Sequence, residues 1–524
     1  MTGTVPATSE TVPPVAELDR TQRLRQVTVL GLLLAAAAIF GPAAGALLYA
    51  GKPLDIVLFA VLLLPFLFWR VRAAPVVMVM AAATGFPRFP DPGADAITAK
   101  IPLFRSFSDS YGLSGAAILP IELILGLALL LWIADAITNR RLSVRSSHLG
   151  IAIAVFTGVT LLAELYGLAR GAVFNISLWE VRPFLYVGLT YLLASQLLTS
   201  RRSMKAVLWA IVLGTGAMSI LGAERTISTI NVYPRPEAIL EHDEAFFFGL
   251  FTLLTVGLWV FGQRGLLRVV ATALLPLVIL SDFGNNRRSA WVILPATLLA
   301  LVIIAYQRMP ERRTRITIVV AVLLVLGTGY TMAFRNSSAV YAEPAHGIWS
   351  QFRPDPRDYQ SNLYREIENM NLGLDIRSSP VIGLGFGVPV PHPIPVFDAS
   401  GVDPLINFIP HNTVLYVWMR MGSIGAVAFW FLIGAAVVAA CRLARLPDAW
   451  YGFLGALVLS ALIAWIAEGW FDKGIVSFRI TILVGTLLGA LEAARRLSVA
   501  GRLGREQAPA EVGPAAVEEP RAAA

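Results

Sequence analysis

Cysteine is almost absent from this chain of 524 residues, because Cys441 is its only example. A single cysteine excludes an internal disulfide and any metal site built on several cysteines. Charge is also scarce: 15% of the residues are Asp, Glu, Lys or Arg, whereas 56% are hydrophobic and the mean hydropathy is +0.68. A soluble domain of this length carries far more charge. The composition therefore excludes an ordinary soluble protein.

Lysine is scarce as well, so arginine carries nearly all of the basic charge behind the net +8. A basic chain can bind nucleic acid, but here the basic residues form short clusters between apolar runs. That distribution is typical of membrane topology. We therefore expect membrane lipid, and no nucleic acid, around this protein.

Apolar runs recur along the chain and are of the length that spans a membrane as a helix. We expect an all-α fold, a polytopic integral membrane bundle of about 14 (12–14) helices with one large extracytoplasmic loop. No cleavable signal peptide is evident, because the first apolar run is too long and follows a polar tail. The expected spans lie near 29–50, 54–69, 74–85, 115–136, 148–166, 183–199, 206–223, 246–262, 269–284, 290–306, 316–334, 416–440, 450–468 and 475–492.

The arginines predict the orientation of these spans. Every second connection is short and basic, which places both termini in the cytoplasm of a multi-pass protein of the cytoplasmic (inner) membrane. The predicted regions are a disordered cytoplasmic tail, N-terminal membrane helices, the large extracytoplasmic loop, C-terminal membrane helices and a second disordered cytoplasmic tail, at 1–27, 28–334, 335–415, 416–492 and 493–524.

Arginines on the outer side work against this orientation signal, so some of them need a favourable partner. Arg287 and Arg288 stand together in a very short link between two apolar helices. A bound anion would favour them, because the backbone N–H groups at the start of a helix also attract phosphate. Arg182, near the outer end of another span, is a further candidate phosphate contact. A solvated loop or a membrane-interface anchor is the alternative explanation for such residues.

The large loop has readable structure of its own. Apolar residues recur at helical spacing through 357–376, which predicts an amphipathic helix whose polar face carries Arg365 and Glu368. The glycine-rich run 383–387 follows, and glycines permit close approach of the backbone to a ligand. An ordinary turn would explain the same glycines.

His411 and Asn412 come directly after Pro410, where the chain is expected to re-enter the membrane as a helix. The dipole at the start of a helix disfavours a charged imidazolium. His411 is therefore expected to be neutral and able to accept a proton. A loop histidine that only bonds to the backbone is the alternative.

These residues resemble the membrane glycosyltransferases of the O-antigen ligase and O-antigen polymerase superfamily over about 284–431. Three elements match in order: Arg288-Ser289-Ala290-Trp291; Arg365 followed by Ser379-Pro380 and Gly383-Leu384-Gly385; and His411-Asn412 followed by Leu415, Gly422 and Ile424-Gly425. The chain departs from the pattern at Arg287, Ser289 and Asn369. It departs also at Arg420-Met421, where an acidic residue often precedes the first glycine of the last element.

The resemblance implies an enzyme of cell-surface polysaccharide synthesis in the bacterial envelope. It would move a glycan from a polyprenyl-pyrophosphate donor to a glycan or lipid acceptor, with no metal and no cofactor. His411 would be the catalytic base, and Arg288 and Arg365 would contact the pyrophosphate. The further candidates for substrate binding are Arg287, Arg182, Gly383, Gly385 and Asn412.

The chemistry of these side chains agrees with that reading. Guanidinium groups give paired, charge-assisted hydrogen bonds to phosphate oxygens and can replace a metal there. Histidine, with an ordinary pKa near ~6.5, suits proton abstraction at neutral pH.

Two other functions remain open. A membrane transporter or flippase, for a lipid-linked oligosaccharide or a small anion, would hold its polar groups near the bilayer midplane, whereas here they gather at the outer edge. A metal-dependent membrane glycosyltransferase would use carboxylates, for which Asp91, Asp95 and Asp109 are candidates. Their spacing among prolines and glycines favours a solvated loop.

Overall fold

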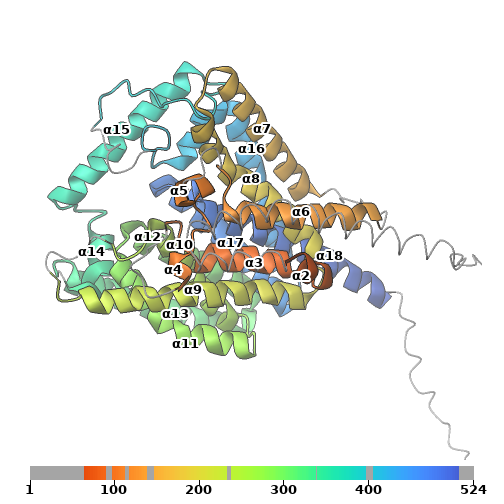
Figure 1. The fold of residues 1–524 in the computed structure, drawn as a ribbon. Coiled ribbons are helices and arrows are strands. Elements are labelled where there is room, and N and C mark those ends of the chain that lie inside the picture. The colour runs from red at the N-terminus through yellow and green to blue at the C-terminus, as the bar shows by residue number, and fades with distance from the viewer. Residues whose placement is uncertain are drawn as a thin grey trace, which may run out of the picture.

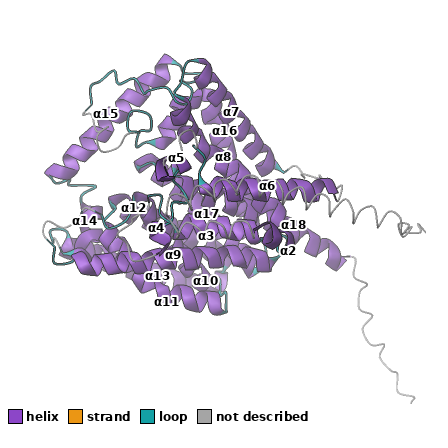
Figure 2. Ribbon diagram, viewed as in Figure 1, coloured by secondary structure: helices purple, strands orange, loops and turns teal. Residues whose placement is uncertain are grey.

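The computed structural model describes residues 64–89, 97–111, 117–138, 147–232, 236, 238–337, 339–396 and 405–506. Every regular element within these ranges is a helix, as Figures 1 and 2 show. The prediction of an all-α fold is therefore confirmed for this part of the chain.

The elements in chain order are α2 (Leu64–Arg70), α3 (Ala74–Gly85), α4 (Ile97–Lys100), α5 (Phe107–Tyr111), α6 (Pro120–Thr138), α7 (His148–Ala169), α8 (Phe174–Leu197), α9 (Arg201–Thr229), α10 (His242–Val260), α11 (Leu266–Asn285), α12 (Arg288–Arg308), η2 (Pro310–Arg312), α13 (Arg313–Phe334), η3 (Val340–Ala342), α14 (Glu343–Trp349), α15 (Pro356–Ser378), α16 (Thr413–Ala444), α17 (Ala449–Phe471), η4 (Gly474–Val476) and α18 (Phe478–Glu506).

Nine helices of the described ranges are long and apolar enough to cross a membrane, namely α6, α7, α9, α10, α11, α12, α13 together with η2, α16 and α17. The protein is thus a multi-pass membrane protein by the composition of its helices. From 74–85 onward, each predicted span coincides with a helix. The total of about 14 spans remains a prediction.

Several predictions fall on parts of the chain that the structure does not describe. The tail 1–27, the span 29–50 and most of the span 54–69 lie outside the described residues, as does the chain after 506. At the other end, α18 continues past the predicted boundary at 492 as far as Glu506. Ala, Leu, Arg and Glu dominate residues 490–497, and these are strong helix formers.

Small residues bring the central helices close together. A Cβ added to Gly485 or Gly489 of α18 would lie 2.6–2.7 Å from the carbonyl oxygens of Val187 or Tyr191 in α8. Close backbone approach at small residues is how helices pack in membranes, where burial of apolar side chains gives no advantage over lipid. The α8–α18 pair therefore forms a tightly packed centre.

The predicted loop helix is α15, and its bounds agree with the expected 357–376 to within two residues. It begins at the N-cap Asp355, whose side chain accepts a hydrogen bond from the backbone N–H of Asp358 at 2.7 Å. Figure 1 shows α15 along one edge of the molecule, beside the bundle of apolar helices. α16 follows the loop and is broken at Gly422, where φ is 62° and ψ is −167°.

A fully buried ion pair fastens the loop to the bundle. Arg420 of α16 lies 2.6 Å from Glu180 of α8, and neither side chain is exposed. The same guanidinium donates to three loop carbonyls, those of Gly385, Val388 and Phe408, at 2.6–3.0 Å. Arg420 therefore holds the chain on both sides of the segment between 388 and 408. A charge this deep is tolerated because both terminal nitrogens of Arg420 donate hydrogen bonds, whereas its Nε has no partner among the described residues.

Candidate functional site

A cavity of about 520 Å³ lies where four helices meet. It is bounded by the start of α12, the middle of α15, the start of α16 and the end of α17. Its lining includes Arg288, Ser289, Arg365, Glu368, His411 and Asn412, with Trp470 and Phe471 forming an apolar wall. The cavity thus brings together the three predicted catalytic residues, which are separated by 77 and 46 positions in the sequence.

Arg288 is the first residue of α12 and is held by the loop helix. One terminal nitrogen lies 3.2 Å from Asp358 Oδ2, and the other lies 3.5 Å from Ser361 Oγ. About a fifth of the Arg288 side chain (22%) is exposed. The guanidinium is therefore anchored to α15 and also lines the cavity.

Arg365 projects from α15 into the same cavity and is partly buried. Among the described residues it forms no ion pair and no hydrogen bond, although its charge acts on Glu468 and Asp472 at the end of α17. A partly buried guanidinium without a hydrogen-bond partner can bind an anion that enters the cavity.

His411 is oriented by Glu368, which lies one turn after Arg365 on α15. The ring nitrogen Nδ1 lies 3.2 Å from both carboxylate oxygens of Glu368, and the backbone N–H of His411 donates to Oε2 at 3.0 Å. The ring also packs edge-on against Tyr364. With Nδ1 assigned as the donor to Glu368, Nε2 is the nitrogen that remains able to accept a proton.

Asn412 is the N-cap of α16, and its Oδ1 accepts a hydrogen bond from the backbone N–H of Leu415 at 3.1 Å. Only 2% of the residue is exposed, and its Nδ2 has no hydrogen-bond partner among the described residues. A buried amide without a partner is costly unless a ligand or water satisfies it. Asn412 lines the cavity, so a ligand there could accept this hydrogen bond.

Two helix N-termini, those of α12 and α16, also meet at this cavity, because Arg288 and Ser289 begin one and Asn412 caps the other. The dipole of each helix places partial positive charge at its N-terminus. Both guanidinium groups and both helix ends therefore favour a multiply charged anion.

Acidic groups behind the cavity balance this charge. Asp472 follows α17 directly, and His242 lies 3.0 Å from its Oδ2. Burial alone would raise the pKa of Asp472, but the hydrogen bond from His242 and the charges of His242, His411 and Arg365 lower that pKa well below its ordinary value. Asp472 therefore stays ionised at neutral pH and lies within electrostatic range of both His411 and Arg365.

Arg287 and Arg182 do not line the cavity. Arg287 is the N-cap residue of α12 and acts electrostatically on Glu468. Arg182 lies in α8, pairs with Glu122 at 2.8 Å and donates to the carbonyl of Ala117. These protein contacts account for Arg182, and its position gives no support for the predicted contact with substrate.

Gly383 and Gly385 pack against backbone and do not line the cavity either. Both have positive φ, +81° and +79°. A Cβ at Gly383 would lie 2.5 Å from the carbonyl oxygen of Arg420, and one at Gly385 would lie 2.6 Å from the Cα of Gly167. Their position is explained by a tight turn docked on α16 and α7, the alternative that the sequence left open.

Three acidic residues of the site were not assigned roles from the sequence. The sequence does place Glu368 near the site, because it follows Arg365 by three positions and so shares its helix face. No local pattern marks Asp358 or Asp472, because only tertiary packing brings Asp358 to Arg288 and Asp472 to His411.

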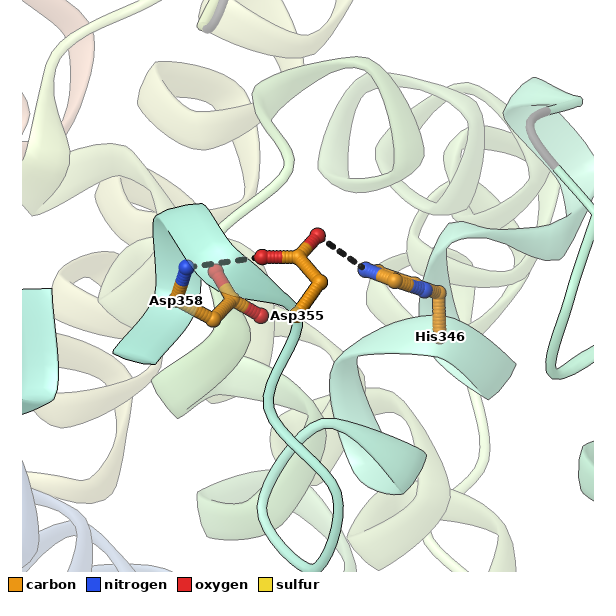
Figure 3. Close-up of side chains that lie close together, drawn as sticks. All are labelled: His346, Asp355 and Asp358. Carbon is orange, nitrogen blue, oxygen red and sulfur yellow. Dashed lines mark hydrogen bonds and ion pairs between the residues drawn. The ribbon is translucent and has the colours of Figure 1, made fainter. Parts of the chain in front are cut away.

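Close to Arg288, three side chains are arranged as in some metal sites (Figure 3). His346, Asp355 and Asp358 place one nitrogen and two carboxylate oxygens within 4.8 Å of one another. Each already has a protein partner: Asp355 caps α15 and lies 3.8 Å from His346 Nε2, and Asp358 pairs with Arg288. Asp109 lies in α5, away from this group, whereas Asp91 and Asp95 lie outside the described residues.

No known family model matches the chain. Over 240 residues it is 24% identical to an "O-antigen ligase" of Salmonella typhimurium (strain LT2), in an alignment that covers 44% of this chain. The chain spans about half the length of that curated relative, with 55% of it covered. This distant similarity and the membrane-like helical bundle fit a membrane protein related to glycosyltransferases.

Proposed function

We propose that this protein is an integral membrane glycosyltransferase. It takes a saccharide from a polyprenyl-pyrophosphate donor and transfers it to a lipid acceptor or to another lipid-linked glycan. The reaction takes place at the outer face of the cytoplasmic membrane and requires no metal. The distant similarity to an O-antigen ligase supports the reaction class.

One observation carries this proposal: Arg288, Arg365, His411 and Asn412 line the same cavity. Its volume of about 520 Å³ is within the range of small-molecule sites. A transporter would hold such groups near the bilayer midplane. α12 has 21 residues and is therefore about 30 Å long, close to the thickness of the hydrocarbon core. Arg288 at its first position thus supports a cavity at the membrane boundary, where a lipid-linked headgroup meets water.

Arg365 and Arg288 would bind the diphosphate, together with the N-termini of α12 and α16. The diphosphate is the leaving group, so negative charge develops on it as the glycosidic bond breaks. Preorganised donors stabilise that charge by about 3 kcal/mol each in a partly dry site. No general acid is required because the diphosphate leaves as a stable anion.

His411 would be the general base. The acceptor hydroxyl oxygen attacks the anomeric carbon, the bond from that carbon to the phosphate oxygen breaks, and its electron pair leaves with the diphosphate. The hydroxyl proton passes to Nε2 of His411, and Glu368 stabilises the imidazolium through Nδ1. A single displacement of this kind inverts the anomeric configuration.

The test is His411→Ala, assayed with purified protein and a polyprenyl-pyrophosphate-linked saccharide. We expect transfer to be lost, by about 100-fold or more, with membrane abundance unchanged. His346→Ala is the matched control, since His346 is another partly exposed histidine of the same loop that does not line the cavity. Full transfer by the His411 variant would remove this residue from the mechanism.

Two further experiments distinguish this enzyme from a metal-dependent glycosyltransferase and from a flippase. Loss of transfer with a chelator would indicate a metal-dependent enzyme. Movement of the lipid-linked saccharide across proteoliposomes without transfer would indicate a flippase. Gene deletion then distinguishes the two enzymatic outcomes: retained single units indicate a polymerase, and accumulated carrier-linked chains indicate a ligase.

A further inference from the structure

A second cavity, of about 430 Å³, lies at the other end of α12. It is bounded by the last turn of α12, the last turn of α16 and the link to α17. Two arginines line it, Arg308 and Arg445, beside Gln307 and the apolar side chains of Ile304, Leu446 and Pro447. Since Arg288 is the first residue of α12 and Arg308 is the last, the two cavities lie about 30 Å apart along the helix.

Arg308 is built into this cavity. It is partly buried and donates to the carbonyl oxygens of Ala444 at 2.5 Å and Pro447 at 2.8 Å. A Cβ added to Gly452 of α17 would lie 2.4 Å from the Arg308 guanidinium carbon, so the helix beside it leaves room only for this side chain. These bonds engage two of the five N–H groups of the Arg308 guanidinium.

Arg445 is exposed at the rim of the same cavity. Its guanidinium forms no hydrogen bond or ion pair with any residue that the structure describes, and the residue is the C-cap of α16. The carbonyls at the end of α16 do not need this side chain, because the Arg308 guanidinium already bonds to the carbonyl of Ala444. Arg445 therefore adds a positive charge that no ion pair with a described residue balances.

The walls show what kind of anion would fit. Ile304, in α12, and Leu446 and Pro447, in the link after α16, are apolar and line the cavity beside the two guanidinium groups. A small inorganic anion would use the charges and leave the apolar walls exposed to water. An amphiphile uses both, with its phosphate on the arginines and its acyl chains along the walls. Basic pockets between membrane helices bind anionic lipid headgroups in this way.

We propose that this second cavity binds the phosphate headgroup of an anionic phospholipid. The site is separate from the one proposed for glycosyl transfer and does not depend on it. Its position at the far end of α12 places the lipid in the leaflet opposite the first cavity.

The only cysteine of the chain, Cys441, lines this cavity and is partly buried, so it reports on the site without any engineering. The experiment measures the rate of alkylation of Cys441 by N-ethylmaleimide in nanodiscs. Phosphatidylcholine discs are compared with discs that also contain phosphatidylglycerol. We expect phosphatidylglycerol to slow alkylation severalfold in the unmodified protein.

Arg445→Gln should abolish this protection, and its melting temperature in phosphatidylcholine discs should be unchanged. Arg442→Gln is the matched control, because Arg442 is an exposed arginine of the same helix turn that does not line the cavity. It removes the same charge from the same membrane surface and should keep the protection.

Three results would overturn the proposal. Equal alkylation rates in both discs would show that no anionic lipid occupies the cavity. Equal loss of protection in both variants would show that diffuse surface charge is responsible. Protection by inorganic phosphate in phosphatidylcholine discs would show a site for small anions instead.

Discussion

Arg288 holds Asp358 at 3.2 Å through one terminal nitrogen, while its other terminal nitrogen lies 3.5 Å from a serine hydroxyl. At the residue scale, the planar geometry of this guanidinium matters more than its charge. A guanidinium can bind two oxygens at once in one plane, whereas an ammonium group binds as a point charge. The proposed diphosphate site would use that planar geometry.

Arg288→Lys should therefore impair transfer far more than conservation of charge suggests. We expect kcat/KM to fall by about 100-fold, measured with the lipid-linked donor. Arg353→Lys is the control, because Arg353 is an exposed arginine of the same loop and lies over the ring of Trp349. Equal turnover by the Arg288 and Arg353 variants would argue against paired hydrogen bonds to phosphate.

Of the basic residues that the sequence predicted for the site, Arg288, Arg365 and His411 line the cavity, whereas Arg287 and Arg182 do not. Arg288 and His411 were visible because each stands where an apolar helix begins, and Arg365 because it lies on the polar face of an amphipathic helix. The pairing of Asp358 could not be predicted, because its partner Arg288 lies 70 positions away and no local pattern marks the pair. The ion pair between Glu180 and Arg420 could not be predicted for the same reason, because 240 positions separate the two residues.

At the scale of elements, the turn 383–387 packs directly against the break in α16. Gly383 fits against the carbonyl oxygen of Arg420, and Gly422 approaches the carbonyl oxygen of Val381 where α16 changes direction. Both glycines have positive φ, so a side chain at either would meet backbone strain as well as a clash. This packing fixes the C-terminal end of α15, and hence the positions of Arg365 and Glu368.

Gly383→Ala should lower the stability of the protein by about 2 kcal/mol or more, from the left-handed backbone and the clash together. Thermal unfolding in detergent measures this. Gly373→Ala in the middle of α15 is the control, since nothing lies within 4 Å of a Cβ built there, and alanine should stabilise the helix by up to about 1 kcal/mol. If Gly383→Ala were as stable as the wild type and only bound donor more weakly, the predicted substrate contact would be favoured over packing.

The limits of α15 could be read from the sequence because its amphipathic period is regular and Asp355 supplies a cap. The break in α16 could not. A single glycine inside an apolar helical pattern is usually tolerated without a break, and only the docking of the turn 383–387 forces Gly422 out of the helical conformation.

At the scale of the whole molecule, the two cavities lie at opposite ends of α12, and the membrane orientation decides which faces the cytoplasm. The positive-inside pattern predicts that the first cavity faces outward. The helix positions predicted from the apolar runs are confirmed from α3 onward. The orientation remains a prediction because a bundle of helices carries no mark of the membrane side.

Cys441 allows a direct test of orientation. A membrane-impermeant maleimide should label the unmodified protein only after spheroplasts are permeabilised. Gln360→Cys in a Cys441→Ser background places a single thiol on the exposed part of α15, and we expect it to be labelled in intact spheroplasts. The reverse pattern would place the first cavity in the cytoplasm and rule out transfer at the outer face.

The pair between Arg288 and Asp358 has a consequence for ligand discrimination. Asp358 lies 3.2 Å from one terminal nitrogen of Arg288, so a carboxylate of the protein already neutralises part of that positive charge. An incoming anion shares Arg288 with this carboxylate and is repelled by its negative charge. A singly charged sugar acid therefore gains little from Arg288 alone, whereas a diphosphate would reach Arg365 at the same time and gain from both.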